Sequence, residues 1–138
     1  MHRPAIVAVA QLADRSRAAF RDRVVLEGWA QVPGLRPPAF GILVSLADGA
    51  VPSQRELGDA VGVHPSDMVE LLDVLEGQGW AARERDPDDR RRYRLSLTDA
   101  GVAVVTRLRA IAAEVEADVL GVLTEAERRE LLGLAERC

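Results

Sequence analysis

The pattern of helix-capping and helix-breaking residues between positions 53 and 79 is the feature that most restricts how this chain can fold. Ser53 followed by Glu56 predicts a capping box, in which each side chain accepts a hydrogen bond from the other residue's backbone N–H. Gly62 ends the short helix that this box opens, and His64-Pro65 begins another after one tight turn, because proline suits the first turn of a helix. Two short helices with this spacing predict a helix-turn-helix.

A single apolar face along the second of these helices supports this interpretation. Its apolar residues recur at positions i, i+3, i+4 and i+7, which places them on one side of a helix: Met68, Leu71, Leu72 and Leu75. Gly77 and Gly79 then end the helix. The other side is left largely to polar residues, and the N-terminal part of a recognition helix is the part that faces DNA base edges.

A short β-hairpin is predicted directly after the helix-turn-helix. Apolar and polar residues alternate from Tyr93 to Leu97, which is typical of a half-buried strand. The stretch from Trp80 to Arg85 supplies the partner strand, and Asp86-Pro87-Asp88-Asp89 supplies the turn. A hairpin in this position is a wing, so the segment from Pro52 to Gly101 is interpreted as a winged helix-turn-helix.

Helices are predicted on both sides of this segment, so the expected fold class is mainly α with a small β-hairpin. These flanking helices are, in order, Ala5 to Trp29, Pro37 to Asp48, Thr98 to about Leu120, and a last one that starts at the Thr124–Glu127 capping box. The whole chain, 1–138, is interpreted as a single domain.

The formal net charge of -4 argues against a nucleic-acid binder, but the basic residues are clustered. From Arg83 to Arg94 the hairpin holds six arginines against four carboxylates, and the chain contains no lysine. Arginine presents a planar fork of donors that suits phosphates and guanine edges. One alternative is that these charges form an ordinary solvated face, but their position after a helix-turn-helix favours contact with DNA.

The segment from Leu57 to Gly101 resembles the MarR family of bacterial regulators. The most specific part of the resemblance is an Asp-Pro-x-Asp-Arg-Arg run that leads to a strand and then to Leu-Thr-x-x-Gly. The matching residues are Glu56-Leu57, Val63-His64-Pro65-Ser66, Leu71-Leu72-Asp73, Leu75-Glu76, Gly79-Trp80, Arg83, Asp86-Pro87-Asp88-Asp89-Arg90-Arg91, Leu95, Leu97-Thr98 and Gly101. The flanking helices match the family in order and length.

The resemblance implies a homodimer, with residues 1–32 and 102–138 in the dimerisation region and residues 37–101 in the DNA-binding lobe. Each subunit of such a protein presents one recognition helix and one wing to a half-site of a palindromic operator. Many family members are repressors that a small phenolic or other apolar ligand releases from double-stranded DNA. The resemblance also implies that Arg91 enters the minor groove and that Asp89 braces the wing by pairing with it. An arginine at a hairpin tip suits the narrow, negative minor groove on physical grounds as well.

The expected DNA contacts come from the wing, the start of the first short helix and the recognition helix. They are Arg91, Arg90, Asp89, Arg83, Arg55, Ser53, His64, Pro65, Ser66, Asp67, Val69 and Glu70. The recognition helix departs from the family, because Glu70 and Val74 stand where relatives often carry arginine. Asp67 has two open interpretations: it complements the helix dipole, or it accepts a hydrogen bond from cytosine N4 while Val69 meets a thymine methyl. His64 is expected to be a helix cap or a phosphate contact.

Two aromatic residues and one cysteine are candidates for a regulatory site. In this family the effector pocket lies between the dimerisation region and the DNA-binding lobe, which makes Trp29 and Phe40 candidate ligand-binding residues. The alternative, which the sequence favours, is that both are core aromatics. Cys138 is the only cysteine, and it is interpreted as an exposed bystander rather than a redox sensor.

Other classes of protein find little support. The sequence shows no nucleophile–base pair, metal-ligand cluster or phosphate loop, so an enzyme is not expected, and neither is a metal or another cofactor. The apolar runs are far shorter than the ~20 residues needed to span a bilayer, and no secretory pattern is present. A cytoplasmic protein without a membrane partner is therefore expected. The competing hypothesis is a winged-helix protein-interaction module with weak or no DNA binding, which the acidic recognition helix favours.

Overall fold

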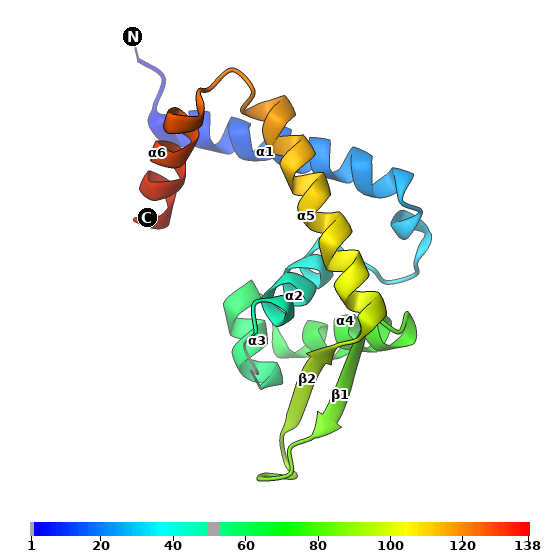
Figure 1. Ribbon diagram of the computed structural model, residues 1–138. Helices are drawn as coiled ribbons and strands as arrows, with labels where there is room; N and C mark the ends of the chain where they lie inside the picture. The colour runs from blue at the N-terminus through cyan, green and yellow to red at the C-terminus, as the bar shows by residue number, and fades with distance from the viewer. Residues whose placement is uncertain (1, 50–52) are drawn as a thin grey trace. The chain divides into compact units, whose positions relative to one another are not determined.

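The computed structural model describes residues 2–49 and 53–138 of the chain. Pro52, which begins the predicted winged segment, lies outside the described residues together with Ala50 and Val51. The elements are, in chain order, α1 (Ala5–Leu26), the 3-10 helix η1 (Trp29–Gln31), α2 (Pro37–Ala47), α3 (Gln54–Val61), α4 (Pro65–Gly77), β1 (Ala81–Arg85), β2 (Tyr93–Leu97), α5 (Asp99–Val119) and α6 (Glu125–Glu136) (Figure 1). The predicted fold class, mainly α with one small hairpin, is confirmed.

The chain divides into two compact units. One unit runs from Gly28 to Arg109 and holds α2, α3, α4, the β1–β2 hairpin and the beginning of α5. The other consists of the residues up to Glu27 together with Ala110–Cys138, so it holds α1, the rest of α5 and α6. In the first unit the hairpin extends away from the three helices (Figure 1).

The helices of the first unit begin where capping residues satisfy their free backbone donors. Ser53 Oγ accepts a hydrogen bond from the backbone N–H of Glu56 at 3.2 Å, and Gly62 ends α3. Among the described residues only this half of the predicted capping box forms. At α4, the Nδ1 atom of His64 accepts from the backbone N–H of Ser66 at 3.3 Å, with Pro65 in the first turn. The cap role predicted for His64 is therefore present.

The hairpin has the alternation that the sequence predicts. β1 and β2 pair antiparallel, with Arg83 opposite Leu95 and Arg85 opposite Tyr93. Leu95 is buried and faces the helices, whereas its neighbours Arg94 and Ser96 are exposed. This arrangement leaves the loop 86–92 at the far end of the hairpin, away from the core. We call β1, β2 and this loop the wing.

The core of the first unit is built from the apolar faces of its helices and the base of the wing. Its most deeply buried side chains are Ala39, Ile42, Leu43, Leu57, Met68, Leu71, Leu72, Leu75, Leu95, Val105 and Leu108. Gly101 allows the start of α5 to lie against the wing, because a Cβ atom there would be only 1.9 Å from the carbonyl oxygen of Trp80. Thr98 supports the same junction, since its hydroxyl accepts from the backbone N–H of Gly101 at 3.0 Å.

The second unit contains one corrected helix boundary. The first helix was expected to continue to Trp29, but α1 ends at Leu26. The physical reason is Gly28, whose φ of +79° is a left-handed conformation that breaks the helix and places Trp29 in η1. Arg23 of α1 pairs with two carboxylates of α5, Glu114 at 3.3 Å and Asp118.

The last helix starts as predicted. Thr124 and Glu127 form a complete capping box, with both reciprocal hydrogen bonds present at 3.1 and 2.8 Å. The bonds to Thr124 lower the pKa of the Glu127 carboxyl below its ordinary value. Within residues 2–49 and 53–138, none of the helices combines the length and the apolar character needed to cross a membrane.

Candidate nucleic-acid interface

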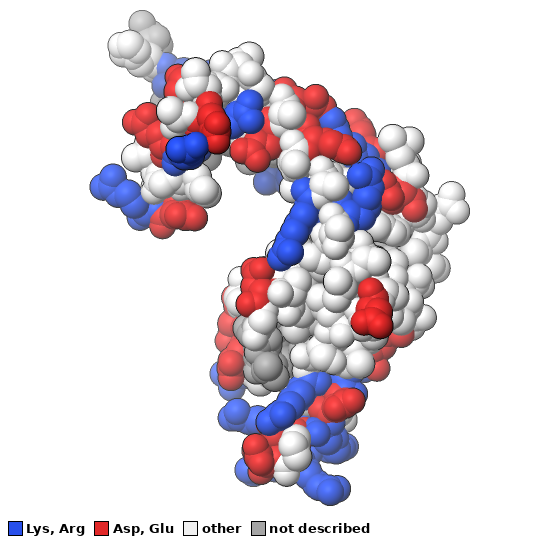
Figure 2. Space-filling view, in the orientation of Figure 1, with Lys and Arg blue, Asp and Glu red and all other residues white. Residues whose placement is uncertain are grey.

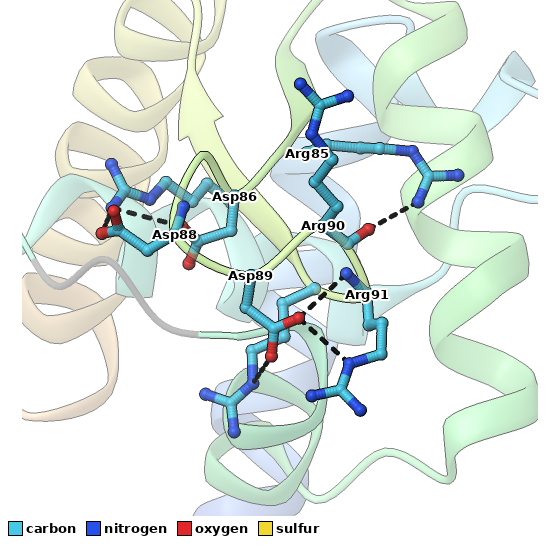
Figure 3. Close-up of polar contacts among 8 residues, drawn as sticks. Arg85, Asp86, Asp88, Asp89, Arg90 and Arg91 are labelled. Atoms are coloured by element: carbon cyan, nitrogen blue, oxygen red, sulfur yellow. Dashed lines mark hydrogen bonds and ion pairs between the residues drawn. The ribbon is translucent and has the colours of Figure 1, made fainter.

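The wing loop places an exposed arginine beside a carboxylate that orients it. Asp89 Oδ1 accepts hydrogen bonds from both the backbone N–H of Arg91, at 3.1 Å, and its Nε, at 3.2 Å (Figure 3). The side chain of Arg91 is 92% exposed, and Arg92 Nε lies 3.8 Å from the other oxygen of Asp89. The backbone bond from Arg91, followed by its side-chain bond, lowers the pKa of Asp89. The Asp89–Arg91 pair that the resemblance implied is therefore present.

Most other arginines of the wing already have partners. Arg85 Nη1 donates to the backbone oxygen of Arg90 at 2.6 Å, and its guanidinium carbon lies 5.2 Å from the centre of the Tyr93 ring. The Nη2 atom of Arg94 lies 3.5 Å from Asp86 Oδ1 and 3.6 Å from Asp88 Oδ2. The guanidinium of Arg90 is exposed and has no ion pair within the described part of the chain. Arg90 and Arg91 are thus the wing cations best placed to meet an outside anion.

The recognition helix α4 carries its acids next to an arginine that the sequence analysis missed. Arg36 precedes α2, and its Nη2 atom lies 3.9 Å from both Asp67 Oδ1 and Glu70 Oε2. All three side chains are substantially exposed, so the two ion pairs are weak and solvent-screened. Arg36 stood next to two prolines in the sequence, and no pattern there indicated that it would reach the face of another helix.

The outward face of α4 is narrower than the sequence suggested. Val69, which was predicted to lie on the DNA-facing side, is 46% exposed. Val74 was expected on the same side, but it is half-buried. Its Cγ2 atom lies 3.1 Å from the position that a Cβ on Gly34 would occupy, so the loop before α2 covers this part of the helix.

A hollow of about 750 Å³ brings together predicted contact residues from three elements. Its lining comes from the start of α3, the start of α4 and the wing: Ser53, Gln54, Arg55, Gly58, Asp59, Val63, Pro65, Met68, Arg91, Arg92 and Tyr93. Four of the predicted DNA contacts, namely Ser53, Arg55, Pro65 and Arg91, therefore surround one concave surface. Ser66 lies beside it, with its hydroxyl 2.8 Å from His64 Nδ1.

Arg83 occupies a different environment from the one expected. It was predicted to contact DNA, but its guanidinium turns toward α4 and donates to Asp73 Oδ1 at 2.6 Å and to Glu76 Oε1. Its side chain is only 22% exposed. Partial burial on its own would lower the pKa of Arg83, but the hydrogen bonds to Asp73 and Glu76 outweigh this effect and raise it. No sequence pattern predicts this pairing, because the partners lie ten and seven positions away on another element.

The candidate effector residues lie in an aromatic cluster. The ring of Trp29 is 5.6 Å from that of Phe40 and 6.1 Å from that of Trp80, which the sequence analysis did not include. Phe40 is buried and Trp29 is half-buried. This arrangement favours the alternative that both are packing residues, with Trp80 as the third member of the cluster.

A metal-binding cluster and the cysteine are the other kinds of site to consider. Within the described residues, no group of three or more histidine, cysteine or acidic side chains is arranged to hold a metal ion. Cys138 is exposed, and its thiol donates to the backbone oxygen of Leu134 at 3.5 Å. Figure 2 shows the charge distribution, with arginines and carboxylates interspersed over the wing at the lower end of the view.

Comparison with known proteins gives consistent matches. A family model described as "MarR family" matches residues 34–92. A Thauera aromatica protein named as a transcriptional regulatory protein for the hcr operon is 35% identical over 104 residues, which are 75% of this chain and 63% of that protein. The chain thus spans about 63% of the length of the curated relatives it matches.

Solved structures match over nearly the whole chain. The transcriptional repressor CouR, solved on a 23-mer DNA duplex, is 31% identical with a TM-score of 0.76, covering 94% of this chain and 88% of that one. Apo MarR from E. coli is 19% identical with a TM-score of 0.81, covering 99% of this chain and 97% of that one. The second match bears on the fold alone.

Proposed function

The chain belongs to the MarR family, and from that premise we propose that it is a sequence-specific, DNA-binding transcriptional regulator. The observation that carries the proposal is the wing loop, where Asp89 orients an Arg91 side chain that is 92% exposed. A cation held in this way suits the negative potential of a narrow minor groove. That CouR was solved on a DNA duplex supports the same role for a related chain.

The proposed binding mode divides the contacts between two grooves. The start of α4, with Ser66, Asp67 and Val69, enters the major groove and faces base edges. Arg90 and Arg91 approach the minor groove, while Arg55 and the backbone donors at the start of α3 meet phosphates. Asp67 is suited to accept a hydrogen bond from cytosine N4, because a carboxylate offers only acceptors.

We further propose that the regulator is a homodimer on a palindromic operator. The unit that holds α1 and α6 exposes several large apolar side chains: Ile6, Val7, Val9, Val25, Leu26, Val122, Leu132 and Leu134. A hollow of about 830 Å³ between α5 and α6 is lined partly by Leu120, Leu131 and Leu132. Exposed apolar surface of this kind marks an interface, and a second copy of the chain is the proposed occupant. In this proposal the protein is a repressor, and a small apolar or phenolic ligand releases it from the operator.

A winged-helix module that binds proteins instead of DNA is the second candidate. The specific observation in its favour is that α4 contains four carboxylates and no basic residue. Carboxylates repel phosphates, so this helix alone disfavours DNA.

The two functions are distinguished by titrating the full chain into labelled random duplex at low salt and then raising the salt concentration. A DNA-binding protein should bind the duplex and release it steeply as salt rises, because each neutralised phosphate releases counterions. No binding to the duplex, together with no retention on heparin, would favour the protein-interaction module.

A further inference from the structure

The four carboxylates of α4 are divided between two arginines from outside the helix. They occur at every third position: Asp67, Glu70, Asp73 and Glu76. The first two lie 3.9 Å from Arg36. The last two both accept hydrogen bonds from Arg83, with a distance of 2.6 Å for Asp73. The contacts of Arg36 are loose and solvated, whereas those of Arg83 are tight and partly buried.

The register of the wing explains why Arg83 reaches α4. Arg83 pairs with Leu95, whose side chain is buried. Residues directly opposite each other on antiparallel strands project from the same face of the sheet, so Arg83 projects toward the helices rather than toward solvent. Its guanidinium carbon also lies 5.9 Å from the centre of the Tyr93 ring. A partly buried cation needs such partners, because removing a charge from water is costly unless it is paired.

Building on the proposed DNA-binding function, we propose that Arg83 is a positioning residue that fixes the wing against the recognition helix and makes no contact with DNA. We call Arg83 and its two carboxylate partners on α4, Asp73 and Glu76, the clamp. The Nε and Nη2 atoms of Arg83 donate to two different carboxylates, so the guanidinium plane is restrained at two points. The clamp joins the middle of β1 to the second half of α4.

This clamp matters because the protein must engage two grooves at once. When two binding elements are held rigidly at the correct distance, the second contact follows the first at a high effective concentration. A wing that moves freely relative to α4 loses that advantage. The base of the wing stays attached through Leu95 and the Trp80–Gly101 junction, so loss of the clamp frees the wing without unfolding it.

The first test compares Arg83→Ala with Arg91→Ala on one duplex over a range of salt concentrations. Arg83→Ala should weaken binding about tenfold. Arg91→Ala should reduce the slope of log K against log[salt] by about 1. In the double variant the loss caused by Arg91→Ala should be smaller than in the unsubstituted protein, because the wing is already misplaced. Losses that simply add in the double variant would show that Arg83 acts independently of Arg91, as a separate DNA contact would, and would overturn the proposal.

The second test uses the opposite partners of the clamp and predicts the sign of the effect. Asp73→Asn combined with Glu76→Gln removes two negative charges from the DNA-binding unit. If these acids only repelled phosphates, duplex affinity would rise, and the positioning role would be wrong. If they hold Arg83, the duplex affinity of this double variant should fall about as far as that of Arg83→Ala. Arg83→Lys should bind the duplex more tightly than Arg83→Ala but less tightly than the unsubstituted protein, because lysine lacks the planar fork.

Thermal unfolding of each variant provides the folding control, with cooperative melting required for a valid comparison. The Asn/Gln pair and the lysine variant keep side-chain volume, so the role of Arg83 remains testable if the alanine variant does not fold. If the unsubstituted protein binds no duplex, both this role and the proposed function are overturned. Duplex binding with additive losses for Arg83→Ala and Arg91→Ala, or tighter binding by the Asn/Gln pair, overturns the positioning role alone.

Discussion

The contact with Asp89 orients the exposed side chain of Arg91. An arginine that is 92% exposed would sample many rotamers, and ordering it on binding costs free energy. The bonds from its backbone N–H and its Nε to Asp89 restrict those rotamers beforehand. Because the same bonds lower the pKa of Asp89, the carboxylate stays ionised, and the restraint persists, at lower pH than for an unpaired aspartate.

At this scale, Arg91→Ala is expected to weaken duplex binding by about tenfold or more. The physical reason is loss of the cation best placed for the minor groove. The measurement is a gel-shift titration at fixed salt, and Arg17→Ala provides a matched control, since Arg17 is also an exposed arginine paired with one aspartate but lies on α1. Equal affinities for Arg91→Ala and the unsubstituted protein would contradict the role of the wing.

The loose contacts of Arg36 lead to a different expectation. Without Arg36, Asp67 and Glu70 face the DNA with no nearby cation, so Arg36→Ala should reduce duplex affinity several-fold. Its melting temperature should change little, because exposed ion pairs contribute about 0–1 kcal/mol. Adding Glu70→Gln should recover part of the affinity by removing one repulsive charge. If affinity is unchanged in Arg36→Ala, Arg36 plays no part in the interface.

The differences among these arginines mark the limit of sequence reasoning at the residue scale. Asp89 and Arg91 were predictable as a pair because they are two positions apart in a motif. The partners of Arg83 and Arg36 were not, because residue type alone does not say which carboxylate lies nearby in space. Both arginines are paired across element boundaries that only the packed structure defines.

At the scale of elements, the sequence was most informative where local chemistry sets the boundary. α3 and α4 begin at the predicted residues because Ser53 and His64 cap their first turns. The hairpin followed from strict alternation between Tyr93 and Leu97. The end of α1 was misplaced because apolar spacing continued past Gly28, whereas the backbone there adopts a positive φ.

The junction between the wing and α5 gives a stability prediction at this scale. Gly101→Ala should destabilise the fold by about 1–3 kcal/mol, the usual cost of overpacking, because the new Cβ would meet the carbonyl of Trp80. Denaturant unfolding monitored by circular dichroism would measure it.

Gly133→Ala is the matched control, since a Cβ on this α6 glycine meets nothing within 4 Å. It should leave stability equal or raise it by up to about 1 kcal/mol, as alanine favours a helix. The account of the junction would be wrong if both substitutions had the same effect.

At the scale of the whole molecule, charge and apolar surface are distributed unevenly. The formal net charge is -4, yet the wing is rich in arginine. The exposed large apolar side chains, by contrast, occur mostly in the unit with α1 and α6. The sequence could indicate both tendencies, but it could not indicate which apolar positions remain uncovered in a single chain.

The uncovered apolar surface predicts self-association. Sedimentation equilibrium at micromolar concentration should give twice the monomer mass, because covering this surface stabilises the pair by about 25 cal/mol per Å² of apolar area. Leu132→Glu should shift the protein toward monomer, since it would bury an unpaired charge. Ala126→Glu, an exposed position at the start of the same helix, is the control. A monomeric unsubstituted protein would contradict the dimer proposal.

Selection of bound sequences from a random duplex pool tests whether this chain recognises a specific DNA sequence as a dimer. A dimeric, sequence-specific regulator should enrich a palindrome whose half-sites lie about one helical turn apart. Arg91→Ala should retrieve the sequence less efficiently from the same pool. Failure of the unsubstituted protein to enrich any sequence would contradict sequence-specific recognition by this chain.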